Sequence, residues 1–133
     1  MSKVGFVGLG IMGKPMAKNM IAAGVDLMVN DLNEAAVAEL KAAGASSGSL
    51  AEIGAQCDVI FMILPNGDIS KAVLFGEGGI ASTLCAGKIV CDMASVTPVE
   101  SKECYEKLAK MGVGFVDSPV SGGEPGAIKG TLA

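Results

Sequence analysis

The sequence predicts an α/β fold with a doubly wound, mostly parallel β-sheet that carries helices on both faces. Short β-rich runs alternate along the chain with helical stretches of about ten residues, which is the pattern of parallel βαβ units. The run Val59–Leu64 is apolar throughout, as expected of a central strand that is buried on both faces. The length of 133 residues corresponds to about one such domain.

Six segments are predicted to be strands because turn residues or helix signals bound them. Right-handed crossovers between parallel strands would place the intervening helices on both faces of the sheet. In chain order, the predicted strands are Lys3–Val7, Asp26–Asn30, a short one near Ala45, Asp58–Leu64, Lys88–Asp92 and Gly114–Asp117.

The helices between these strands carry recognisable start and stop residues. A capping box needs Ser or Thr followed three residues later by Glu, and Pro98 suits the first position of a helix. Glycine after a basic last turn is a common helix stop. The expected starts are Asn33-Glu34, Ser49–Glu52 and Thr97–Glu100, and the expected stops are Gly44, which follows Lys41, and Gly112.

Composition and charge exclude several classes of function. The net charge is −4 and all ten cations are Lys, so a nucleic-acid groove is not expected. The sequence has no His, which excludes a Ser-His-Asp triad and the usual zinc hydrolase site. The four cysteines stand in apolar contexts without a C-x-x-C motif, which favours buried thiols over a metal or redox site. A reducing, cytoplasmic compartment is therefore expected.

No segment of the sequence is predicted to enter a membrane. The longest unbroken apolar run, Val59–Leu64, is far shorter than the roughly twenty residues that span a bilayer. A signal peptide beginning at Lys3 is disfavoured because glycines interrupt its apolar stretch.

A glycine-rich segment, Gly8-Leu9-Gly10-Ile11-Met12-Gly13, connects the first strand to a helix. This context is the one that the dinucleotide-binding fingerprint of the Rossmann fold requires. Gly8 would make the tight turn, Gly10 would let the backbone approach a pyrophosphate, and Gly13 would let helix and strand pack closely. The helix N-terminus would then offer amide donors to the phosphates. The alternative is an ordinary strand-to-helix turn.

Asp31 ends the second strand and lies 23 residues after Gly8. An acid at about this spacing accepts hydrogen bonds from the adenine ribose and repels a 2′-phosphate. Leu32 stands where an NADP enzyme can carry Arg, and the chain has no Arg, so NAD is favoured over NADP. The alternative is that Asp31 only caps the helix that begins near Asn33, and both roles can coexist.

Three further segments follow strands at the edge where open parallel sheets bind ligands. In Asp117–Gly123, the Ser121 hydroxyl and the amides of Gly122 and Gly123 suit a carboxylate, although the segment could also be a simple turn. The other two segments are Leu64-Pro65-Asn66 and Asp92–Ser95.

Together these motifs resemble the β-hydroxyacid dehydrogenase family. The family motif G-x-G-x-M-G-x-x-M-A is matched by Gly8–Ala17, the substrate motif D-x-P-V-S-G-G by Asp117–Gly123, and the resemblance covers the whole chain. It implies NAD-dependent reduction of a small carboxylated semialdehyde, or the reverse reaction. The segments near Asn66 and Ser121 are most similar to the 2-hydroxy-3-oxopropionate (tartronate semialdehyde) reductase branch. A 3-hydroxyisobutyrate or 2-(hydroxymethyl)glutarate dehydrogenase, and a non-catalytic dinucleotide-binding module, are the alternatives.

The resemblance also implies which residues form the site. Ser121, Gly122 and Gly123 would hold the substrate, and no metal is expected. The catalytic Lys of the family lies on a helix beyond Ala133, and Lys129 has the character of a surface residue. We therefore expect residues 1–133 to be a dinucleotide-binding domain that is inactive alone, followed by a helical domain in a homo-oligomeric protein. The cofactor residues would be Gly8, Leu9, Gly10, Ile11, Met12, Gly13, Asn30, Asp31, Leu64, Pro65, Asn66 and Ser95.

Overall fold

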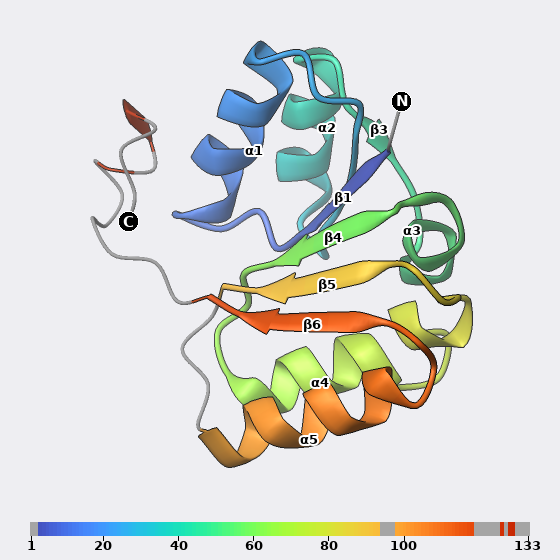
Figure 1. Ribbon diagram of the computed structural model, residues 1–133. Coiled ribbons are helices and arrows are strands. Elements are labelled where there is room, and N and C mark those ends of the chain that lie inside the picture. Colours follow the sequence, from blue (N-terminus) through green and yellow to red (C-terminus); the bar gives the residue numbers. More distant parts are fainter. Residues whose placement is uncertain (1–2, 94–97, 119–125, 127, 130–133) are drawn as a thin grey trace.

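The computed structural model describes residues 3–93, 98–118, 126 and 128–129. In this part of the chain, six parallel strands form one sheet in the order β3-β2-β1-β4-β5-β6 (Figure 1). The strand order reverses between β1 and β4, which confirms the predicted doubly wound fold. The strands are β1 Val4–Val7, β2 Leu27–Asn30, β3 Ser46–Ser47, β4 Val59–Met62, β5 Ile89–Asp92 and β6 Gly114–Asp117.

Helices connect the strands and cover the sheet unequally. α1 and α2 pack on one face, over β1 and β2, and the other helices pack on the opposite face (Figure 1). Right-handed crossovers on either side of the reversal in strand order produce this division. The helices are α1 Gly13–Ala22, α2 Glu34–Ala42, α3 Leu50–Gln56, α4 Gly67–Phe75, the 3₁₀ helix η1 Ile80–Ser82 and α5 Pro98–Ala109.

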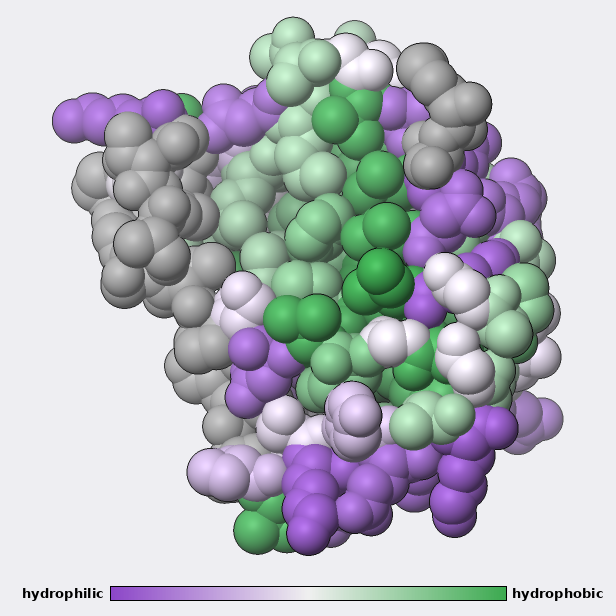
Figure 2. All heavy atoms as spheres, in the orientation of Figure 1, coloured by the Kyte–Doolittle hydropathy of each residue, from purple (hydrophilic) through white to green (hydrophobic). Residues whose placement is uncertain are grey.

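Two apolar layers, one on each face, form the core. The layer beneath α1 and α2 contains Phe6 and Val29, and the larger layer beneath α3, α4 and α5 contains Ile60 and Val90; all four are fully buried. Because successive strand residues point to opposite faces, each central strand contributes to both layers. Figure 2 shows apolar side chains gathered on the sheet face that α1 and α2 cover only in part.

Most predicted helix boundaries are confirmed. Ser49 and Glu52 form the reciprocal capping box of α3, with both hydrogen bonds at 3.1 Å. Pro98 is the first residue of α5, and Gly112 adopts a φ of +75° after that helix, a backbone conformation that glycine tolerates without a steric penalty. Thr97, the predicted cap of α5, lies outside the described residues.

The cysteines only partly follow the prediction of buried thiols. Cys57 and Cys104 are buried and Cys91 is half-buried, but Cys85 is exposed because it lies in the loop between η1 and β5. All four are free thiols. Burial raises the pKa of Cys57 to about 11, so this thiol is protonated at neutral pH.

The described residues lack two kinds of structural feature. None of their helices is long and apolar enough to cross a membrane. No group of three or more Cys, Asp or Glu side chains in the same residues is arranged to hold a metal ion.

Candidate functional site

Five of the six strands end in register at one edge of the sheet. Val7 pairs with Asn30 on one side and with Met62 on the other, and the row continues through Asp92 to Asp117. The segments that follow these strands therefore all leave from the same edge. This carboxyl edge, at the reversal of strand order, is where open parallel sheets bind ligands.

The glycine-rich loop after β1 needs glycine for a different reason at each position. Gly8 has a φ of +101°, and a side chain there would overlap the Ile63 carbonyl. A side chain at Gly13 would overlap the Gly8 carbonyl, so this glycine permits the start of α1 to approach the loop. A Cβ at Gly10 would meet no atom of the described residues within 4 Å. The loop is thus tightly packed at both ends and open in the middle.

Asp31 links this loop to the turn after β2. Its Oδ2 accepts a hydrogen bond of 2.6 Å from the Leu9 amide, and its Oδ1 accepts one of 2.7 Å from the Asn33 amide. Such bonds to a charged acceptor are stronger than those between neutral groups. The alternative that Asp31 caps α2 is wrong, because the Asn33 side chain makes the cap by accepting bonds from the Ala35 and Ala36 amides.

A pocket of about 330 Å³ lies along the glycine-rich loop. Its lining comes from the ends of three adjacent strands, β2, β1 and β4, and combines backbone, one carboxylate and apolar side chains. This volume falls within the range of small-molecule sites. The lining residues are Gly8, Gly10, Ile11, Met12, Gly13, Asp31, Ile63, Leu64 and Pro65.

The N-terminus of α1 borders this pocket and has no side-chain cap. The N-cap residue is Met12, whose side chain accepts no hydrogen bond, and the first turn contains no acid. By contrast, Asn33, Ser49 and Asn66 cap α2, α3 and α4 with their side chains. The positive end of the α1 dipole is therefore available to an anion.

Other predicted cofactor residues have structural roles outside this pocket. The Asn30 amide donates a 2.9 Å hydrogen bond to the Gly48 carbonyl, which joins β2 to the loop after β3. Asn66 caps α4 through the Ile69 amide at 3.0 Å. Leu9 contributes its amide to Asp31 while its side chain is buried in the core. The predicted site residues Ser95, Ser121, Gly122 and Gly123 lie outside the described residues.

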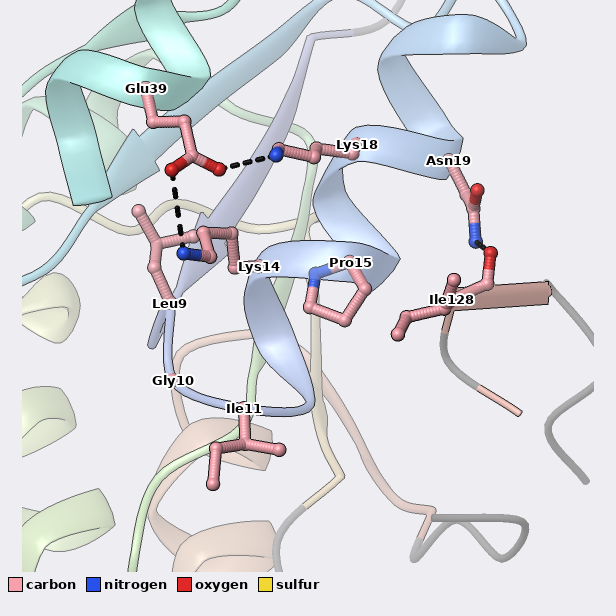
Figure 3. A pocket seen from close by; sticks show the side chains of 9 residues that line it. All are labelled: Leu9, Gly10, Ile11, Lys14, Pro15, Lys18, Asn19, Glu39 and Ile128. Carbon is pink, nitrogen blue, oxygen red and sulfur yellow. Dashed lines mark hydrogen bonds and ion pairs between the residues drawn. The ribbon is translucent and has the colours of Figure 1, made fainter. Parts of the chain in front are cut away.

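A larger pocket, of about 610 Å³, lies on the outer side of α1 (Figure 3). Lys14 and Lys18 point toward Glu39 of α2, and both form ion pairs with it. The hydrogen bond from Lys18 is the main reason that the pKa of Glu39 is lowered. Glu39 pairs with both ammonium groups, but its single negative charge offsets only one of them, so the three side chains together keep one positive charge.

Two features of the site were not predicted from the sequence. The bond between Asp31 and the Leu9 amide depends on the turn at Gly8, and no residue pattern encodes it directly. The helix α4 was also not predicted, although Asn66 followed by Gly67 and Asp68 is a reasonable helix start. Of these three residues only Asn66 had a predicted role, and that role was cofactor binding.

Comparisons with known proteins agree with this geometry. The family model of the NAD-binding domain of 6-phosphogluconate dehydrogenase matches residues 3–133. The chain is 44% identical over 131 residues to 2-(hydroxymethyl)glutarate dehydrogenase from Eubacterium barkeri, covering 98% of this chain and 44% of that protein. It is 39% identical over 131 residues to 2-hydroxy-3-oxopropionate reductase from Escherichia coli strain K12, covering 98% and 45%.

The solved structure of Psf3 in complex with NADP⁺ and 2-OPP has a TM-score of 0.91 at 25% identity, and the match covers 97% of this chain and 46% of that one. The chain thus spans less than half the length of these relatives. The resemblance to dehydrogenases and reductases of the β-hydroxyacid type is confirmed. The chain belongs to the family of the NAD-binding domain of 6-phosphogluconate dehydrogenase.

Proposed function

We propose that the pocket along the glycine-rich loop binds NAD(H), and that the chain is the cofactor domain of a reductase for a small carboxylated semialdehyde. The observation that carries this proposal is the position of Asp31. Its carboxylate lines the pocket and is fixed by the Leu9 and Asn33 amides at the end of β2.

The residues of the pocket fit a dinucleotide. The open backbone at Gly10 leaves space for a pyrophosphate, and the uncapped N-terminus of α1 supplies partial positive charge. Asp31 would accept hydrogen bonds from the adenine ribose, and Ile63 and Leu64 would supply an apolar wall. Asn30 and Asn66 would act indirectly, by fixing the segments after β2 and β4.

The same arrangement favours NAD over NADP. A ribose 2′-phosphate beside the Asp31 carboxylate would meet a like charge, and Leu32, which is fully exposed, cannot pair with it. The chain contains no Arg to do so. Since Psf3 was solved with NADP⁺, affinity for both cofactors has to be measured on this chain.

For the substrate, we propose 2-hydroxy-3-oxopropionate or a similar carboxylated aldehyde. When bound, the nicotinamide supplies hydride to the carbonyl carbon. Ser121, Gly122 and Gly123 would hold the substrate carboxylate, and Ser95 would line the nicotinamide site. The alkoxide oxygen needs a proton donor, for which we propose a Lys in a helical domain after residue 133. Lys129 is exposed, as expected of a surface residue.

The test is NADH oxidation with 2-hydroxy-3-oxopropionate, run on the 133-residue chain and on the product of the complete reading frame. We expect both to bind NADH and only the longer product to turn over. Turnover by the short chain would refute the assignment of the proton donor. The two alternative substrates, 2-(hydroxymethyl)glutarate and 3-hydroxyisobutyrate, are tested with NAD⁺ in the direction of oxidation. If both proteins bind NADH but neither turns over any of the three substrates, a non-catalytic dinucleotide-binding module is favoured.

A Ser121→Ala variant tests the substrate site separately. In the longer product, it should raise KM for the carboxylated substrate while leaving the Kd for NADH unchanged. A weakened NADH affinity with an unchanged KM would show that the substrate was assigned to the wrong segment.

A further inference from the structure

Half of one sheet face carries no helix among the described residues. α1 and α2 cover this face over β1 and β2, whereas α4 and α5 pack on the opposite face. Residues of β4, β5 and β6 that point to the α1 side are therefore uncovered by any described helix (Figures 1 and 2). We call this surface the open face; it consists of Phe61, Ile89, Cys91 and Val116.

The open face has the composition of a buried surface. All four residues are apolar or thiol-bearing, and Ile89 and Val116 are 43% and 49% exposed although they lie within strands. Their strand neighbours Val90 and Phe115 are buried in the core on the opposite side. Parallel sheets are as a rule covered on both faces. The strands β4 to β6 carry apolar side chains on both faces, as expected of strands that are covered on both sides.

The size of the open face distinguishes between possible partners. With about 3.3 Å per residue and roughly 4.8 Å between strands, it measures roughly 13 Å by 14 Å. This projected footprint of roughly 200 Å² is small for a stable interface, in which each partner buries approximately 800 Å² of accessible surface. A second copy of the chain would therefore be held weakly by this face alone. One α-helix, about 10–12 Å wide with its side chains, fits it.

After β6, one described residue lies on the same side of the sheet as the open face. Ile128 lies beside α1, where its carbonyl accepts a 3.4 Å hydrogen bond from the Asn19 side chain (Figure 3). This places Ile128 on the side of the open face. The relatives matched above each have more than half of their length outside the matched region.

We propose that the open face is covered by one amphipathic helix from the polypeptide that follows residue 133 in the longer protein. This inference rests on the proposed function, which includes a helical domain after that residue. The helix would place its apolar side against Ile89, Cys91 and Val116, and would thereby attach the second domain to the rigid sheet rather than to a loop.

Thiol labelling tests this directly. In a Cys85→Ser background, which removes the exposed native thiol, Val116→Cys places a probe on the open face. Tyr105→Cys is the matched control, because Tyr105 is 56% exposed and belongs to α5 on the opposite side. Each variant is made in the 133-residue chain and in the longer product, and labelling rates are followed by mass spectrometry.

The Val116→Cys thiol should react at least about tenfold more slowly in the longer product than in the short chain, as expected when opening of a packed helix limits access. The Tyr105→Cys thiol should react at the same rate in both. The labelling rate of the native Cys91 thiol should also be lower in the longer product than in the short chain. This measurement tests the proposal even if the Val116→Cys variant fails to fold.

Several results would overturn the inference. Equal Val116→Cys rates in both proteins would mean that the face stays open, and slow labelling in both would mean that residues 1–133 cover it themselves. Protection in the short chain that grows with protein concentration would indicate a second copy. A reading frame that ends at residue 133 would also refute it. Labelling does not depend on enzymatic turnover. A longer product that is inactive but still protects the Val116→Cys thiol would therefore refute the proposed function and leave this inference standing.

Discussion

Replacing Asp31 separates its two effects on cofactor binding. The carboxylate stands at the end of β2, where a 2′-phosphate of NADPH would approach it. For unit charges about 5 Å apart and an effective dielectric constant of ~40, the repulsion is about 1.7 kcal/mol. Asp31→Asn removes this repulsion while keeping a side-chain oxygen for the Leu9 amide. We therefore expect the ratio of Kd for NADPH to Kd for NADH to fall by roughly 15-fold.

Asp31→Ala should behave differently because it also releases the glycine-rich loop. The Leu9 and Asn33 amides lose their acceptor at 2.6 and 2.7 Å, and bonds to charged groups are worth about 1.5–3 kcal/mol each. The Ala variant should bind both cofactors more weakly than the Asn variant. It should also unfold at lower temperature.

The assay is fluorescence titration with NADH and NADPH at fixed, moderate ionic strength, with thermal unfolding measured in parallel. Asp26→Asn is the control, because Asp26 is exposed at the opposite end of β2 and its loss removes the same charge. An unchanged affinity ratio in Asp31→Asn, or an equal change in Asp26→Asn, would refute the role of Asp31 in cofactor selection.

Other variants test the loop, the caps and a buried thiol. Gly13→Ala should lower the stability by about 1–3 kcal/mol in chemical denaturation, whereas Gly10→Ala, where a Cβ meets open space, should mainly weaken NADH binding. Met12→Asp should stabilise α1 by about 0.3–1 kcal/mol yet raise the Kd for NADH. If the variant gained both stability and affinity for NADH, phosphate binding at the N-terminus of α1 would be refuted. Ser49→Ala should cost about 1 kcal/mol with unchanged titration curves. Because Cys57 ionises near pH 11 when folded but near pH 9 when unfolded, stability should fall as pH rises from 9 to 11, and less steeply in Cys57→Ala.

The strands could be predicted from the sequence because their pattern is local. All six predicted strands are present, and apolar runs bounded by turn residues were enough to find them. The fourth was predicted to extend to Leu64 but ends at Met62. Ile63 still donates to the Val7 carbonyl at 3.0 Å, after which the chain turns to line the pocket. The boundary therefore depends on the neighbouring loop, which a strand pattern does not encode.

The chemical roles of single polar residues were harder to predict. Asn66 follows a strand at the carboxyl edge, so a ligand contact and a helix cap are both compatible with its position in the sequence. The structure shows the cap. For Asp31, the sequence left open whether the acid caps α2. That question is settled by Asn33, which makes the cap with its own side chain and leaves both Asp31 oxygens for backbone amides.

The distribution of caps explains why the pocket lies at α1 and not at another helix of the same edge. A side-chain cap contributes about 1 kcal/mol to a helix, and α2, α3 and α4 each have one, whereas α1 has none. The helix that lacks a cap begins at the glycine-rich loop. This loop is open in the middle, at Gly10, and tightly packed at its ends, at Gly8 and Gly13. An anion at this position would restore the missing interaction by binding to the folded state. We propose that the stability given up at α1 becomes affinity for a ligand, and that the Asp31 carboxylate, fixed at the end of the neighbouring strand, selects which phosphorylated ligand binds.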